Sequence, residues 1–465
     1  MPKISFSTLI TSCFLCTTIP VCAQTLNMKE AIGTAINNYG IIKAKGNYVN
    51  ASKESLKQTR RDYLPNLSIG VQQDFGTING QNGPLTAAGG LSAASSGPAL
   101  ASQNWNAAFG ALYLSNFNWD FFTFGRIKQR INVSKAVLKR DENDLQQEIF
   151  QHEIRVSAAY LNLLAAQRLT KSQQKNLERS IIFKNNATVR AANGIIAGVD
   201  SSLANAEVSS AKIALTQAID RQQEQANRLG ILMGITSTDF VLDTTSINHV
   251  PKSILINDTT TNLTNHPVLK YYRNRIDVSD QQVNYFRRLA YPTVSLIGVL
   301  QGRGSGFSSD YNVNQDHYTQ NYGDGVNPTR GNYLFGVGLT WNLTTILRNS
   351  PQIKSQRYIS SALEDEYKQA DQQYHAQLAL AENKIRNAMS NYNEAPVQVK
   401  AASEAYLQKS TLYKNGLTTI VDLTQALYAL NRAETDRDIA YTNVWQALLL
   451  KAAAAGDYNI FINEF

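Results

Sequence analysis

Cysteine is nearly absent from this chain, and the cysteines it has lie together at its start. All of them precede Gln24, in a segment that has Lys3 near its start, continues as an apolar run and ends in Val21-Cys22-Ala23, which resembles an A-x-A cleavage site. This layout is typical of a secretory signal, so we expect residues 1–23 to be removed. A chain without cysteine excludes a disulfide, a thiolate metal site and a cysteine nucleophile. The cysteines concerned are Cys13, Cys16 and Cys22.

Lipidation at Cys22 is the alternative fate of this segment. A lipidation signal has a small residue before the cysteine, whereas Val21 is bulky. Cleavage without lipidation is therefore the favoured expectation.

A second absence is that of long apolar runs. No run after the signal approaches the roughly 20 residues that a membrane helix needs, so any membrane insertion must use strands. The formal charge is +8, but lysine and arginine alternate with acidic residues along helical stretches, and an exported protein seldom meets nucleic acid. No nucleic-acid partner is expected.

Catalytic and metal-binding patterns are also missing. The five histidines share no metal-ligand spacing, and none stands in a Ser/His/Asp or HExxH setting. The sequence indicates no enzyme, no cofactor and no metal.

Proline and glycine are absent between Arg126 and Arg190, where apolar residues recur in sevens. This coiled-coil-like pattern predicts a helix of roughly 100 Å. A second such helix is expected from Ile353 to Lys414, with a kink at Pro396. Shorter helices are expected at Met28–Arg61, Ser201–Leu232, Val268–Leu289 and Thr424–Ala455.

Between the helices, the apolar pattern changes to a period of two. From Asn332 to Leu343, large apolar residues alternate with asparagine, glycine and threonine. Such alternation predicts strands of about 9–11 residues, the length that spans a membrane. We expect strands at 65–75, 107–119, 292–302 and 332–343, joined in pairs by long external loops at 76–106 and 303–332.

Aromatic and basic residues mark the ends of these expected strands. Amphipathic rings favour a membrane interface, and arginines at a helix end suit both the helix dipole and anionic headgroups. The expected interface anchors are Arg60, Arg61, Tyr63 and Trp119, then Arg287, Arg288, Tyr291 and Trp341.

The chain is an internal duplication. Asn193-Gly194 and Val199-Asp200 recur 222 residues later as Asn415-Gly416 and Val421-Asp422, and the same offset joins Trp119 to Trp341. Between Asn38 and Pro65, the offset to the equivalent residues of the second repeat is 227. The sequence therefore predicts a first repeat at 24–250 and a second at 251–465.

Four strands cannot close a membrane barrel, which needs about eight, and an open edge in lipid leaves backbone groups unpaired. Several copies must therefore share one barrel. The fold class expected is an α+β membrane protein, with long antiparallel helices in an α-helical barrel and four strands per chain in a shared β-barrel.

The whole chain after the signal resembles the TolC family of outer-membrane efflux proteins. The resemblance rests on the duplicated helix–strand–strand–helix order, the proline at each strand start (Pro65, Pro292) and the Gly-x-x-x-x-Val-Asp turns. It implies a homotrimer with a twelve-stranded barrel in the outer-membrane lipid and a helical barrel across the periplasm. It also implies a periplasmic adaptor (membrane fusion) protein and an inner-membrane pump or ABC transporter as partners.

The same resemblance makes the two turns periplasmic tips. Asn-Gly permits the left-handed conformation that reverses the chain, and Asp200 and Asp422 can cap the helices that follow. The resemblance implies adaptor docking at the tips and a gate beside them. The docking residues are Asn193, Gly194, Val199, Asn415, Gly416 and Val421.

Within the gate, the resemblance pairs Tyr413 with Asp200 and places Asp422 in a three-fold carboxylate ring that attracts cations. Two positions depart from the family pattern: Thr418 replaces an arginine, and Gln425 replaces a second aspartate. We therefore expect fewer charged links between neighbouring tips than in the family, and a single carboxylate ring at the aperture.

The function expected is a passive outer-membrane exit duct of a tripartite efflux pump, in the outer membrane and periplasm of a Gram-negative-type bacterium. The alternatives are the outer-membrane component of type I protein secretion and a periplasmic coiled-coil adaptor without a pore. A secreted hydrolase is a distant third, because no nucleophile or base can be named.

Overall fold

The computed structural model describes residues 25–80, 97, 99–236, 238–244, 249–255 and 263–465. The expected signal peptide, with Cys22, lies outside the described residues, and so does most of the loop expected at 76–106. The first half of the chain contains α1 (Met28–Asn38), α2 (Gly40–Arg61), β1 (Asn66–Thr77), β2 (Ala107–Phe122), α3 (Arg126–Ala192) and α4 (Gly198–Met233).

The second half repeats the order of helix, two strands and two helices. It contains α5 (Lys252–Leu255), η2 (Leu263–Asn265), α6 (Pro267–Arg288), β3 (Thr293–Ser305), α7 (Tyr322–Val326), β4 (Arg330–Thr340), α8 (Thr344–Lys414), α9 (Ile420–Ala455) and α10 (Asn459–Ile462). The expected sequence of elements is therefore present twice.

Helix boundaries differ from expectation by more than a few residues at two places. Met28–Arg61 is two helices, because Tyr39 adopts an extended conformation (φ −66°, ψ 119°) before Gly40, a poor helix former. The second long helix begins at Thr344 rather than Ile353 and continues through Pro396 without ending. Across the described residues, no helix combines the length and apolarity that membrane crossing requires.

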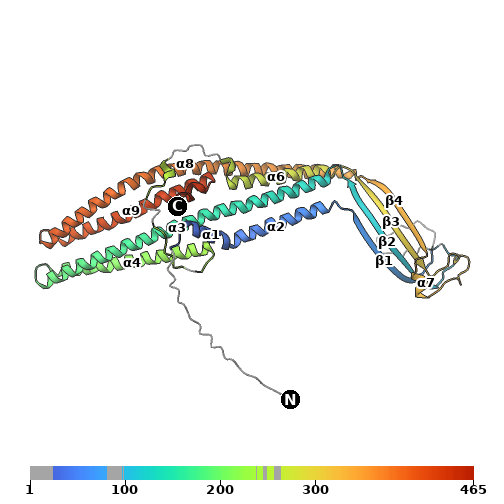
Figure 1. The fold of residues 1–465 in the computed structure, drawn as a ribbon, viewed down its shortest axis with the longest axis horizontal. Helices are drawn as coiled ribbons and strands as arrows, with labels where there is room; N and C mark the ends of the chain where they lie inside the picture. The colour runs from blue at the N-terminus through green and yellow to red at the C-terminus, as the bar shows by residue number, and fades with distance from the viewer. Residues whose placement is uncertain (1–24, 81–96, 98, 237, 245–248, 256–262) are drawn as a thin grey trace, which may run out of the picture. The chain divides into compact units, whose positions relative to one another are not determined.

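The four strands form one antiparallel sheet in the order β1-β2-β3-β4, shown side by side in Figure 1. Ile69 pairs with Ser115, Ser115 with Leu300, and Leu300 with Tyr333, so these side chains share one face. That face is apolar and exposed in the single chain. Its exposed large residues include Leu67, Ile69, Val71, Phe75, Leu300, Tyr333, Phe335, Val337 and Leu339.

The chain divides into two compact units that do not coincide with the two repeats. The first, here called the core unit, comprises Met1–Ala44, Gln146–Pro267 and Asp371–Phe465. The second, the strand unit, comprises Lys45–Leu145 and Val268–Ala370. Each unit therefore contains residues from both repeats.

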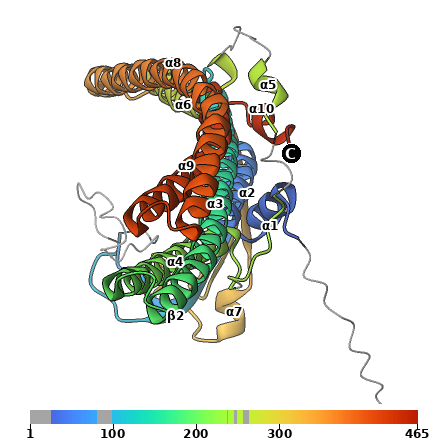
Figure 2. The same cartoon turned by 90° about the vertical axis from the view of Figure 1, so that its left-hand side faces the viewer.

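The core unit is built around buried residues of α1, α3, α4, α9 and α10. Met28, Tyr160, Leu229, Trp445 and Phe461 are essentially inaccessible there. From this core, α3 and α4 run side by side to one turn, and α8 and α9 run to another (Figures 1 and 2). The core therefore anchors both helical tips.

In the strand unit, equivalent helices pair through polar contacts. Ser279 Oγ lies 2.8 Å from Ser360 Oγ and accepts from Gln356 at 2.7 Å, which joins α6 to α8. In the first repeat, Thr59 and Ser134 are 3.0 Å apart and join α2 to α3. Polar side chains thus accompany the apolar heptads between these helices.

Candidate functional site

Both helical tips turn by the same backbone device. After α3, Gly194 has φ 69°, its N–H donates to Ala191 O, and the Ile195 N–H donates to Arg190 O at 2.9 Å. After α8, Gly416 has φ 76°, with equivalent bonds to Tyr413 O and from Leu417 to Leu412 O. Each pair of bonds is a Schellman motif, which satisfies carbonyls that a helix end leaves free. The expected left-handed glycines are confirmed.

The helices that follow the turns do not begin with aspartate caps, so that expectation is wrong. The N-cap residues are Ala197, which has no side-chain cap, and Thr419. Asp200 and Asp422 both stand three residues after the N-cap. Only the second tip has a capping box, because alanine has no side-chain acceptor.

The Asp422 carboxylate is held by the two threonines before it. Its Oδ2 accepts from Thr418 Oγ1 at 2.7 Å and from Thr419 Oγ1 at 3.0 Å, and Lys409 Nζ lies 3.9 Å away. These bonds, first that from Thr418, hold the pKa of Asp422 below its ordinary value. Thr418, where the family pattern has arginine, therefore orients the carboxylate and favours its ionised form.

Tyr413 is buried between the hairpins. Its side chain is 4% exposed and lies 5.9 Å, between ring centroids, from Phe183 of α3. The hydroxyl has no hydrogen-bond partner among the described residues. Burial raises its pKa, Arg190 lowers it and Asp200 raises it again. Asp200 is thus near enough to act electrostatically, while the expected Asp200–Tyr413 latch is not a hydrogen bond within one chain and stays a prediction.

Arg190 is a tip residue that sequence reasoning missed. Its guanidinium lies over the Tyr413 ring, 5.1 Å from the centroid, and donates to Tyr413 O and, at 3.3 Å, to Lys414 O. These carbonyls belong to the last turn of α8, which favours a cation. Position in the last turn of α3 was the only available signal, and it could not name a partner more than 200 residues away.

The remaining tip residues are mostly exposed. Val199 and Val421 are 65% and 53% exposed, and Gln425 is exposed one turn beyond Asp422. The tips also expose Ile195, Leu203 and Leu417. The expected docking of an adaptor at these tips stays a prediction.

The expected anchors at the sheet end form the same contact in both repeats. Trp119 Nε1 donates to Tyr63 O at 2.8 Å, and Trp341 Nε1 donates to Ala290 O at 3.0 Å. Each tryptophan thereby ties a strand end to the turn that starts the other strand. Arg288 lies over the Tyr291 ring at 5.4 Å, while Arg60, Arg61 and Arg287 are exposed.

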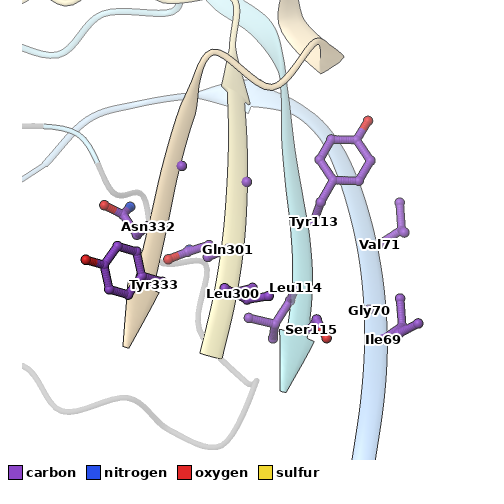
Figure 3. A pocket seen from close by; sticks show the side chains of 12 residues that line it. Ile69, Gly70, Val71, Tyr113, Leu114, Ser115, Leu300, Gln301, Asn332 and Tyr333 are labelled. Atoms are coloured by element: carbon purple, nitrogen blue, oxygen red, sulfur yellow. The ribbon is translucent and has the colours of Figure 1, made fainter. Parts of the chain in front are cut away.

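The apolar sheet face is hollowed where small residues replace large ones. A depression of about 510 Å³ is bordered by Ile69, Val71, Tyr113, Leu300 and Tyr333. Figure 3 shows Ile69, Val71 and Tyr113 together on one side of β1 and β2. Among the described residues, no group of histidine, aspartate and glutamate side chains is arranged to hold a metal ion.

The outer membrane efflux protein family matches residues 32–235 and 260–449 of this chain. None of the curated proteins matches it. Solved structures with the same fold include VceC from Vibrio cholerae, at 16% identity and a TM-score of 0.70, covering 92% of this chain and 96% of that one.

Two further outer-membrane channels are similar. CmeC of Campylobacter jejuni has 14% identity and a TM-score of 0.72, covering 92% of this chain and 85% of that one. The open state of MtrE from Neisseria gonorrhoeae has 16% identity and a TM-score of 0.70, covering 92% of this chain and 89% of that one. At these identities the likeness concerns the fold.

The family match includes both tips and all four strands, which sets aside the pore-less adaptor and the hydrolase. The chain therefore belongs to the outer membrane efflux protein family, related to TolC, and is an efflux channel of the bacterial outer membrane that extends into the periplasm, not an enzyme.

Proposed function

We propose that three copies of this chain form the exit duct of a tripartite efflux pump. The observation that carries the proposal is the sheet, which exposes an apolar face and has β1 and β4 as its outer strands. In lipid the face is solvated by acyl chains, but the outer strands need partners. Pairing β1 of one copy with β4 of the next closes the sheet, and three copies supply twelve strands.

The tips supply the docking surface and the gate. Val199, Val421 and their exposed apolar neighbours fit a periplasmic adaptor, which links the duct to an inner-membrane pump. Transport energy comes from that pump. The Asp200–Tyr413 latch would then form in the closed assembly, once a side-chain movement brings the buried Tyr413 hydroxyl to Asp200.

Asp422 would form a ring of three carboxylates around the closed mouth. Like charges disfavour simultaneous ionisation, but the bonds from Thr418 and Thr419 oppose this effect and favour the ionised form. Asp422→Asn should lower the cation-to-anion permeability ratio in planar bilayers. Asp220→Asn, an exposed change on α4, is the matched control and should leave the ratio unchanged.

Two measurements test the assembly itself. The protein purified in detergent should have the mass of a trimer and should conduct ions in a planar bilayer. A monomer, or a trimer without conductance, would contradict the proposal. Loss of the gene should increase susceptibility to amphiphilic drugs; unchanged susceptibility with loss of an exported protein would favour the type I secretion alternative.

A further inference from the structure

Two polar contacts join α9 to both helices of the first hairpin, which α3 and α4 form. The Arg179 guanidinium of α3 donates to both carboxylate oxygens of Glu434, at 3.1 and 2.6 Å. The Tyr428 hydroxyl of α9 donates to the Glu207 carboxylate of α4. Glu207 is 6% exposed, and the paired Arg179 and Glu434 side chains are 20% and 18% exposed. These two contacts, here called the clamp, are costly to break, because a largely buried charge would lose its partner.

The clamp fixes the orientation of the two hairpins as well as their separation. A bidentate pair between a guanidinium and a carboxylate has a defined geometry. Tyr428 and Glu434 are six residues apart on α9, about 9 Å along the helix axis. Because the two attachments reach different helices of the first hairpin, they oppose twisting as well as separation. The tips, with the predicted Asp200–Tyr413 latch, lie beyond the clamp and can change locally without breaking it.

The internal duplication shows what the equivalent contact between copies contains. An offset of 222 residues relates α3 and α4 to α8 and α9, which form the second hairpin. In a closed ring, the second hairpin of one chain therefore meets the first hairpin of the next copy much as the two hairpins meet within one chain. All the counterparts of the clamp residues are exposed in the single chain. The counterparts of Arg179, Glu434, Glu207 and Tyr428 are Ala401, Lys212, Ala429 and Ala206.

None of these counterparts can rebuild the clamp. Alanine has no polar side chain, so it pairs neither with Lys212 nor with a second alanine. Arg190 follows the same rule: within the chain it donates to Tyr413 O, whereas its counterpart Leu412 has no side-chain donor. The polar contacts that join the hairpins within one chain therefore have no equivalent between copies.

We propose that the clamp holds the two hairpins of each chain as one rigid body, and that the mouth of the duct opens at the seams between copies. A seam is the contact at which α8 of one chain meets α4 of the next. Arg179, Glu434, Glu207 and Tyr428 are then positioning residues of the gate. The inference rests on the trimeric duct proposed above.

A new ion pair at the seam tests which contact yields. Ala401→Glu places a carboxylate opposite Lys212 of the next copy, and both positions are exposed, so folding should be preserved. Three such pairs should lower the open probability of the trimer in planar bilayers about threefold or more at low salt. KCl at about 1 M should remove most of this effect. Ala401→Gln is the matched control, and adding Lys212→Gln to Ala401→Glu should restore the wild-type open probability.

Hydrogen exchange tests the clamp itself. Arg179→Gln should accelerate amide exchange in residues 176–192 and 423–437 about tenfold or more, because the hairpins lose a charge-assisted pair. Exchanging the charges, in Arg179→Glu with Glu434→Arg, should restore slow exchange. Lys175→Gln, an exposed change on α3, is the control. Wild-type exchange rates in Arg179→Gln would refute the clamp.

The wild-type protein separates failure of this inference from failure of the duct. A wild type that is monomeric or does not conduct contradicts the duct itself. A wild-type trimer that conducts, with an unchanged open probability in Ala401→Glu, overturns only the opening at the seams.

Discussion

Tyr39 and His152 stack with ring centroids 3.8 Å apart and an interplanar angle of 17°. In the second repeat, His266 and Tyr374 lie 4.0 Å apart. Tyr39 and His266 are 227 residues apart, and His152 and Tyr374 are 222 apart, which are the repeat offsets. Tyrosine and histidine have therefore exchanged places between equivalent positions.

Both histidines tie down the end of a helix. His152 Nε2 reaches Leu232 O at 3.0 Å in the last turn of α4, and His266 Nε2 reaches Ala453 O at 3.2 Å in the last turn of α9. Both rings are fully buried. Despite the exchange, each repeat keeps one hydrogen bond between a buried histidine and a carbonyl in the last turn of a helix.

Acid should destabilise the core unit through these rings. Burial lowers the pKa of both histidines. Arg155 lowers the pKa of His152 further, while the bond to Leu232 O and the charge of Glu148 oppose the shift. For His266, the bond to Ala453 O opposes it. Below pH 6.5 the unfolded chain binds protons that the folded chain does not. The free energy of unfolding should then fall by at most about 1.4 kcal/mol per histidine per pH unit. Tm measured between pH 7.5 and 5 checks this.

Glu153 should partly oppose the acid effect. Burial raises its pKa to about 7, so its contribution to stability grows as pH falls from 7 toward 4.5. Glu153→Gln should therefore make Tm fall more steeply in acid. The matched control is His375→Gln, an exposed change. If the Tm of Glu153→Gln fell with pH only as steeply as that of the wild type, the opposing role of Glu153 would be contradicted.

Exchanging the two residues of the Tyr39–His152 stack should reproduce the arrangement of His266 and Tyr374 in the second repeat. His152→Tyr alone should lose the bond to Leu232 O and lower stability by about 1 kcal/mol. Adding Tyr39→His restores the order seen in the second repeat and should recover most of that loss. Tm values of both single variants and the double variant test the coupling; additive losses would show that the stack is not transferable.

The latch prediction can be separated from folding. Because the Tyr413 hydroxyl has no partner among the described residues, Tyr413→Phe should not destabilise the chain. Increased conductance or antibiotic leak in Tyr413→Phe and Asp200→Ala would then report a contact made in the assembly. Tyr406→Phe, one heptad earlier on α8, is the control. Unchanged conductance in both variants would remove the latch.

Arg190→Ala should loosen the second tip. The variant loses charge-assisted bonds to the last carbonyls of α8 and the contact with the Tyr413 ring, together about 1–3 kcal/mol. Hydrogen exchange of residues 410–424 should accelerate accordingly. Lys184→Ala on the same helix should leave it unchanged. Exchange at the wild-type rate in Arg190→Ala would show that Arg190 does not hold the tip.

The two tryptophan contacts should contribute independently. Trp119→Phe and Trp341→Phe each remove one hydrogen bond to a helix–strand turn, at about 1 kcal/mol. Because the contacts belong to different repeats, the losses in Tm should add in the double variant. Trp105→Phe changes a ring that is 80% exposed and serves as the control.

Much of the fold follows from local patterns in the sequence. The apolar heptads between Arg126 and Arg190 predict α3, and the alternation from Asn332 to Leu343 predicts β4, because these periods match the helix and the strand. The Asn-Gly turns were placed correctly because glycine alone tolerates the left-handed conformation at little cost. The boundary at Tyr39 was missed, since its ring is held by a partner on another helix.

The sequence by itself determined the duplication, the element types and the turns, since each depends on residues close together in the chain. Only the tertiary structure decided which side chains meet. Arg190 on Tyr413, Trp341 on Ala290 and His152 on Tyr39 join residues that lie far apart in sequence. No local period encodes such contacts, because they depend on how whole helices and strands pack.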